Sequence, residues 1–81
     1  MISFTTLSKG TKGTNVIALQ FFLRAEGYLS ASGKPIDVDG DFGNETKGAV
    51  INFQKVMNAY GANLRSDGVF DDKCYRKVLG V

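Results

Sequence analysis

One short phrase occurs twice in this chain of 81 residues, and a helical pattern follows each copy. The copies are Asp39-Gly40-Asp41-Phe42 and Asp67-Gly68-Val69-Phe70. In each copy the aspartate accepts backbone hydrogen bonds, the glycine permits a positive φ, and the phenylalanine is directed inward. The repeat therefore predicts one structural unit used twice: a tight turn that buries an aromatic ring and starts a helix.

The spacing of apolar residues predicts an all-α fold, a compact three-helix bundle built on the repeated Asp-Gly-x-Phe unit. The expected helices span roughly Thr14 to Glu26, Asn44 to Tyr60 and Asp71 to Leu79. In the first helix, Val16, Leu19 and Leu23 share one face. The second carries a broad apolar stripe of Thr46, Ala49, Val50, Phe53, Val56, Met57 and Tyr60, opposed by Lys47, Lys55 and Asn58. The third is expected to turn Cys74, Tyr75 and Val78 inward.

Length and cysteine content predict a single small domain over residues 1–81, with residues 1–6 as a leader or the remnant of a linker. A chain this short buries only about 60% of its unfolded surface. Cys74 is the only cysteine, so no internal disulfide supports the fold. It falls on the inward face of a helix, where a buried and unreactive thiol is expected.

Several kinds of site are excluded by composition. The chain has no histidine, which removes His-based acid/base catalysis and most zinc sites. The net charge is only +2, and basic residues alternate with acidic ones, which argues against nucleic acid as a partner. No apolar run approaches the length that spans a membrane. Neither an enzymatic activity of the chain itself nor a membrane partner is expected.

Alternating carboxylates at Asp37, Asp39 and Asp41 suggest a calcium loop, but the spacing beyond them does not fit. An EF-hand-like loop needs glycine at its sixth position and glutamate at its twelfth, and these positions hold Phe42 and Gly48. We expect no metal site and no cofactor here, and interpret the aspartates as turn-capping or solvated residues.

Four motifs, in order and spacing, resemble the signature of the small three-helix peptidoglycan-binding domain found beside many cell-wall hydrolases. They are the lead-in Leu7-Ser8-Lys9-Gly10-Thr11-Lys12-Gly13, the helix from Val16 to Leu23 with the following Ala25-Glu26-Gly27-Tyr28, the Asp39 to Thr46 turn, and Ala49-Val50 with Phe53-Gln54. Together they cover nearly all of residues 7–79.

The resemblance implies a non-catalytic module that targets an associated hydrolase, for example a phage endolysin, to peptidoglycan in the cell wall or extracellular space. The ligand would be the peptide stem or a muropeptide. Separately, the small positive net charge leaves open a weak attraction to anionic wall polymers. No signal peptide is visible, so the chain is either exported without one or forms part of a longer protein. The alternative is a protein docking domain that uses Ile17 and Phe21, unless Ile2 and Phe4 of the leader cover that surface.

The resemblance also places a ligand groove between the end of the first helix and the Asp39 to Thr46 turn. The ligand-binding residues it suggests are Arg24, Tyr28, Asp41, Asn44, Gln20 and Gln54. Arg24 would pair with a carboxylate of the stem, and Tyr28 would form a stacking wall. For Gln20 and Gln54 two readings stay open: each either bonds loop backbone or lines the groove.

Overall fold

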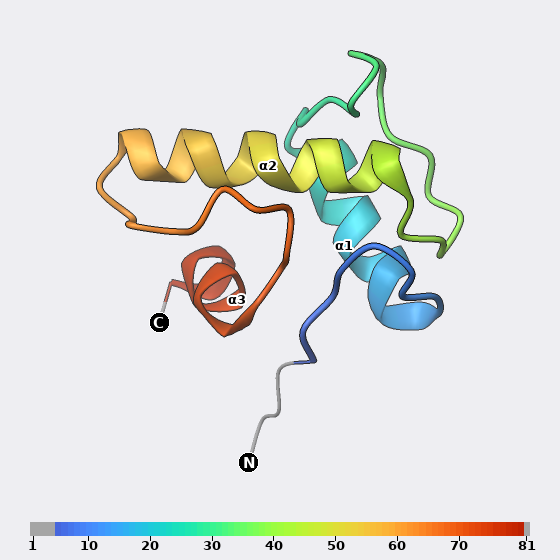
Figure 1. Cartoon of the computed structure of the whole chain (residues 1–81), viewed down its shortest axis with the longest axis horizontal. Helices are drawn as coiled ribbons and strands as arrows, with labels where there is room; N and C mark the ends of the chain where they lie inside the picture. Colours follow the sequence, from blue (N-terminus) through green and yellow to red (C-terminus); the bar gives the residue numbers. More distant parts are fainter. Residues whose placement is uncertain (1–4, 81) are drawn as a thin grey trace.

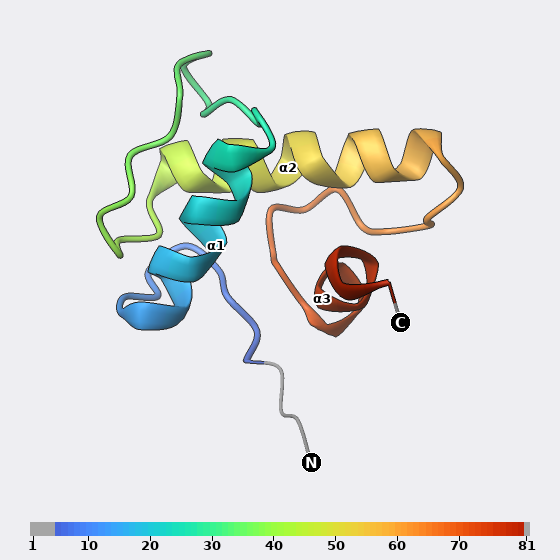
Figure 2. The ribbon, with the colours of Figure 1, turned by 180° about the vertical axis from the view of Figure 1, so that it is seen from behind.

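The computed structural model describes residues 5–80, which form three helices. They are α1 (Thr14–Ala25), α2 (Asn44–Ala59) and α3 (Asp72–Leu79), so the predicted all-α fold is confirmed. α1 crosses α2 steeply, and α3 lies below α2 with its axis nearly along the line of sight (Figure 1). The opposite view shows α1 in front of α2 and the loop before α2 projecting to one side (Figure 2). Among residues 5–80, none of the helices combines the length and the hydrophobicity that a membrane-spanning segment requires.

The core forms where the three helices meet. Its buried apolar residues are Leu7, Val16, Leu19, Leu23, Ile36, Phe42, Ala49, Val50, Phe53, Leu64, Phe70 and Cys74. Phe42 and Phe70 are 1% and 2% exposed at the entrances of α2 and α3, as the repeat predicts. Phe53 of α2 lies beside Phe70, with ring centroids 5.7 Å apart.

The two turns share their backbone geometry. Gly40 and Gly68 both have φ of 77°, a left-handed conformation that glycine adopts without steric cost. In each turn the preceding aspartate accepts a hydrogen bond from the N–H two residues later, at 3.0 Å. The two Asp-Gly copies are therefore one conformation used twice.

A buried glutamine holds the first turn. The side chain of Gln20 in α1 is 1% exposed. Its Oε1 accepts hydrogen bonds from the N–H groups of Asp39 and Gly40, at 3.0 and 2.8 Å. Its Nε2 lies 3.1 Å from each of three acceptors, Asp39 Oδ1, the Asp41 carbonyl and Thr46 Oγ1. One amide thus joins α1 to the turn and to the first turn of α2.

Gln54 repeats the arrangement one helix later. It is 1% exposed, and its Oε1 accepts from the N–H of Gly68 at 3.0 Å. Its Nε2 donates to the Val69 carbonyl at 2.9 Å and lies near Asp67 Oδ1 and Cys74 Sγ, at 3.4 and 3.5 Å. Helices α1 and α2 therefore each supply a glutamine that holds the turn leading into the next helix.

The lead-in segment before α1 connects the two turns. Leu7 and Phe70 exchange two backbone hydrogen bonds, at 3.0 and 2.8 Å. Further along, the N–H of Gly10 donates to the Phe42 carbonyl at 2.8 Å, and the N–H of Phe42 donates to the Thr11 carbonyl at 3.0 Å. Residues 7–13 thus hold both buried phenylalanines by their backbones, a role the sequence did not reveal.

The apolar stripe predicted for α2 is wrong at its carboxyl end, where Val56 and Tyr60 are 41% and 84% exposed. The loop after α2 packs instead on the side of the helix that carries Asn58. There Asn58 accepts a hydrogen bond from the N–H of Leu64 at 2.5 Å and donates to its carbonyl at 2.7 Å. Val78 of α3, expected to face inward, is 38% exposed.

Ile17 and Phe21 of α1 lie on the surface and are 37% and 63% exposed. The expectation that Ile2 and Phe4 cover them lies outside the described residues.

We predict that Phe42→Ala lowers the free energy of unfolding by about 3–5 kcal/mol, because it leaves a cavity in the core. Such a loss is comparable to the whole stability of a small domain. Phe21→Ala removes an exposed ring and serves as the control. Thermal and urea unfolding followed by circular dichroism should show a large loss for Phe42→Ala alone, and equal melting of the two variants would refute the inward turn.

Gln20→Met keeps the approximate shape of the side chain but removes its hydrogen bonds. Each polar group left unpaired and buried costs about 1–3 kcal/mol. We therefore expect urea unfolding to show a free energy of unfolding that is lower by at least that amount. The control is Asn52→Ala, which removes one exposed bond to the Leu29 carbonyl and should change stability little. If both variants unfold alike, the turn does not depend on Gln20.

Candidate functional site

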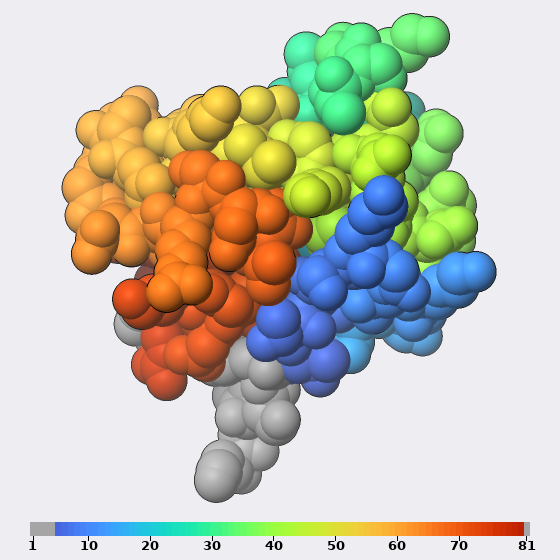
Figure 3. Space-filling model, viewed as in Figure 1, coloured from blue at the N-terminus to red at the C-terminus, as the bar shows by residue number. Residues whose placement is uncertain are grey.

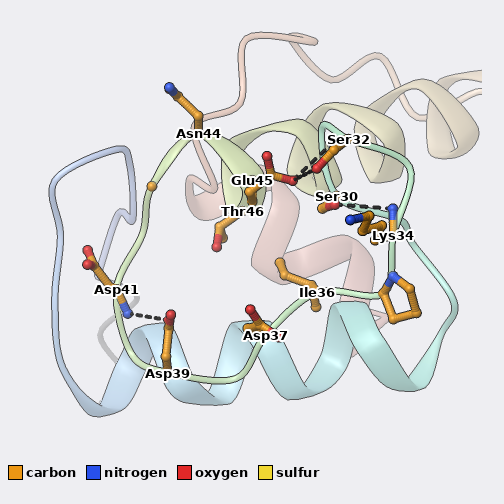
Figure 4. Close-up of a pocket in the computed structure, with 12 residues that line it drawn as sticks. Ser30, Ser32, Lys34, Ile36, Asp37, Asp39, Asp41, Asn44, Glu45 and Thr46 are labelled. Carbon is orange, nitrogen blue, oxygen red and sulfur yellow. Dashed lines mark hydrogen bonds between the residues drawn. The ribbon is translucent and has the colours of Figure 1, made fainter.

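A groove of about 350 Å³ lies between loop 30–37 and the turn that starts α2 (Figure 4). It is lined by Ser30, Ser32, Lys34, Pro35, Ile36, Asp37, Asp39, Asp41, Gly43, Asn44, Glu45 and Thr46. Figure 4 shows α1 running beneath the groove, the turn with Asp39 and Asp41 at one end, and the loop with Ile36 and Asp37 opposite α2.

Side chains of both α1 and α2 hold the loop in place. Ser32 donates from its backbone N–H and its hydroxyl to Oε2 of Glu45, at 3.1 and 2.5 Å. Arg24 donates from Nη1 to the carbonyl of Ile36 at 2.8 Å, and the Ile36 side chain is 1% exposed. One wall of the groove is therefore tied to α2 by Glu45, to α1 by Arg24 and to the core by Ile36.

The other wall is the turn that Gln20 holds. Asp41 and Asn44 are exposed on it, and within residues 5–80 neither side chain has a hydrogen-bond partner. Gly43 is the N-cap of α2 and, having no side chain, provides no side-chain cap. Two polar side chains without partners therefore stand on rigid backbone at the rim of the groove.

The groove carries an excess of negative charge, since its lining includes four carboxylates, on Asp37, Asp39, Asp41 and Glu45, and one ammonium group, on Lys34. Hydrogen bonds from the Asp41 N–H and from Gln20 lower the pKa of Asp39. The pKa of Glu45 is also lowered, and the hydrogen bond from the Ser32 hydroxyl is the largest cause. Both carboxylates are thus held in the charged form, and the groove favours hydrogen-bond donors and cations.

Of the residues that the sequence suggested, Asp41 and Asn44 line the groove. Arg24 and Tyr28 do not. The guanidinium of Arg24 bonds the carbonyl of Ile36 behind the wall, and the ring of Tyr28 packs edge-on against Phe53, with centroids 5.5 Å apart. Burial raises the pKa of the Tyr28 hydroxyl. Both residues support the scaffold around the groove instead of facing into it.

Gln20 and Gln54, which were suggested as ligand contacts, do not line the groove. Each is 1% exposed, and both ends of each amide are bonded to the turns. A ligand cannot reach these side chains unless the core opens. Of the two readings left open, loop bonding is the one that their geometry fits.

Sequence reasoning missed the loop residues that complete the groove, above all Ser32, Ile36 and Glu45. Two signals pointed to them. Ile36 is a large apolar residue in a loop rich in serine, glycine and charged residues. Gly48 is a glycine inside a helix, where a Cβ would lie 2.6 Å from Ala31. Both indicate that the loop folds back onto α2.

Asp37, Asp39 and Asp41 do not converge. Among residues 5–80, no three His, Cys, Asp or Glu side chains are placed to hold one metal ion. Cys74 is buried, and burial raises the pKa of its thiol, as expected for an unreactive cysteine.

Known proteins resemble this chain both in sequence and in fold. The sequence model of the family described as "Putative peptidoglycan binding domain" matches residues 12–78. The zinc D-Ala-D-Ala carboxypeptidase of Streptomyces albus G is 40% identical over 73 residues, which is 90% of this chain but only 26% of that protein. The crystal structure of the SleB N-terminal domain superposes with a TM-score of 0.78 at 29% identity and covers 99% of this chain and 96% of that one.

The family match extends over most of the chain and includes α1, α2 and nearly all of α3. It confirms the resemblance seen in the four sequence motifs, and the SleB domain confirms the three-helix architecture. The matched part of the carboxypeptidase is short, so the catalytic part of that protein lies elsewhere. This chain therefore belongs to the family of peptidoglycan binding domains.

Proposed function

We propose that this non-catalytic domain binds peptidoglycan through the groove beside α2 and thereby keeps an associated hydrolase on the cell wall. The observation that carries the groove assignment is the pair Asp41 and Asn44. Their side chains are exposed and have no partner within residues 5–80, yet their backbone is fixed by the turn that Gln20 holds. Preorganised polar groups of this kind favour binding, because little order is lost when a ligand arrives.

The part of peptidoglycan that fits this groove is the peptide stem. A stem offers amide N–H groups and, in many walls, an ammonium group, both of which suit the carboxylate of Asp41. It also offers short apolar side chains, for which the exposed ring of Pro35 provides contact. The excess of carboxylates makes donors on the ligand the favoured partners, the reverse of the expected pairing between Arg24 and a stem carboxylate.

The hydrolase association is supported by the relatives. The carboxypeptidase contains the matching region as about a quarter of its length, and SleB carries it as an N-terminal domain. A module of modest affinity joined to a catalytic domain raises the effective concentration of that domain at an insoluble, repetitive substrate. The setting of this function is the cell wall.

The exposed side chains of Ile17 and Phe21 favour docking to another protein as a second candidate function. Phe21 is 63% exposed, which is high for a phenylalanine in the middle of a helix.

We expect Asp41→Asn and Asn44→Ala each to weaken binding to purified sacculi, stripped of other wall polymers, by about tenfold, the size of one lost charge-assisted or buried hydrogen bond. Cosedimentation measures the affinity. Glu26→Gln removes the same charge outside the groove, and Phe21→Ser removes the exposed ring, so both should bind like the parent. If only Phe21→Ser loses binding, the docking surface is the wall contact and the groove assignment fails.

Arg24→Ala should weaken sacculus binding by about three- to tenfold without changing the melting temperature appreciably, since it releases the loop from α1 and leaves the core intact. Hydrogen exchange at the Gly33 amide, which donates to the Ser30 carbonyl at 2.9 Å, should become faster. Arg65→Ala, an exposed arginine in another loop, is the control. Weaker binding without faster exchange would instead indicate that Arg24 contacts the ligand directly.

A further inference from the structure

A second hollow, of about 210 Å³, lies at the other end of the molecule, between the loop after α2 and helix α3. It is lined by Ala62, Asn63, Leu64, Lys73, Arg76 and Lys77. The loop and α3 adjoin on the left of the molecule in Figure 3, away from the segment 30–46 that forms the groove. All three ionisable side chains of this hollow are cationic, whereas the groove is rich in carboxylates.

The loop wall of the hollow is fixed in place. Leu64 is 7% exposed in the core, and its backbone N–H and carbonyl both bond the side chain of Asn58. Asn63 next to it adopts a left-handed conformation with φ of 58°. The hollow is therefore bounded by a pinned loop on one side and by a helix on the other.

Folding explains only some of the cations on α3. Lys73 is in the first turn of the helix, where the helix dipole disfavours positive charge. Lys77 is four residues later on the same face, and like charges at this spacing repel. The positive charge of Arg76 is balanced by an ion pair with Asp72, at 2.7 Å. Within residues 5–80 neither lysine has such a partner. The dipole favours Arg76 and Lys77 near the carboxyl end, but it leaves Lys73 without a structural reason.

We propose that this hollow binds the phosphate groups of a phosphodiester polymer attached to the cell wall. A phosphate placed between Lys73 and Lys77 would relieve their repulsion, and the guanidinium of Arg76 has donors beyond the Nε that bonds Asp72. A single exposed phosphate contact is weak, but a polymer presents many phosphates in series, and the contacts add through avidity.

This second contact goes beyond binding of the peptide stem. Helix α2, with 16 residues, is about 24 Å long and separates the acidic groove at its amino end from the basic hollow beyond its carboxyl end. The domain can then engage a stem and a neighbouring anionic polymer at once. Each contact raises the effective concentration of the other.

The test compares sacculi that carry wall teichoic acid with sacculi from which it has been removed. The parent chain should bind the first several-fold more tightly, and moderate salt should abolish the difference by screening. Lys73→Ala/Lys77→Ala should bind both kinds of sacculi as the parent binds the stripped ones. Lys9→Ala/Lys55→Ala removes the same charge elsewhere and should keep the parent's preference. Circular dichroism checks that both double variants are folded.

Inorganic phosphate provides a second readout. In a titration followed by amide chemical shifts, residues 62–64 and 73–77 should respond in the parent and not in Lys73→Ala/Lys77→Ala. Equal binding of the parent to both kinds of sacculi would overturn the phosphate site while leaving peptidoglycan binding in place. An equal loss of binding to teichoic acid-bearing sacculi in the two double variants would also overturn the phosphate site, because the attraction would then depend on net charge and not on this hollow. The proposal would also be overturned if the chain bound a DNA oligonucleotide more tightly than teichoic acid and this binding depended on Lys73 and Lys77.

Discussion

The structure depends on two buried glutamine amides, which join α1 and α2 to the turns leading into α2 and α3. A chain of 81 residues with one cysteine has only a small core and no disulfide. Gln20 and Gln54 supply the missing rigidity, because each places a two-sided hydrogen-bonding group inside the core and satisfies the backbone of an Asp-Gly turn. Buried polar groups that are fully bonded fix one arrangement, whereas unbonded ones would favour opening.

The hydrogen bonds of Gln20 also connect the fold with the proposed ligand groove. Gln20 fixes the turn from inside, so the outward side chains of Asp41 and Asn44 project from backbone that cannot easily move. In the second copy, the turn held by Gln54 leads into α3 and carries Val69 where the first copy has Asp41. One scaffold used twice therefore produces a polar rim in the first copy, while the second copy supplies the helix that bears the basic hollow.

Sequence reasoning predicted what local patterns determine. The three helices were found to within one or two residues, and both turn phenylalanines were expected in the core, since periodicity and turn chemistry are properties of neighbouring residues. The side-chain positions of Arg24 and Tyr28 could not be derived, because both depend on contacts with distant segments. Arg24 bonds the Ile36 carbonyl in loop 30–37, and Tyr28 packs against Phe53 of α2. The backbone pairing of residues 7–13 with both turns is likewise a contact between distant segments that side-chain patterns do not encode.

The most direct test of the binding groove is a map of amide chemical shifts of the isotope-labelled chain, titrated with soluble muropeptides released from stripped sacculi. If the groove binds the stem, the amides of residues 30–37 and 39–46 shift together and saturate with one dissociation constant, while those of α3 stay unchanged. Shifts centred on Ile17 and Phe21, or no saturable shift at all, would contradict binding in the groove that Gln20 holds open.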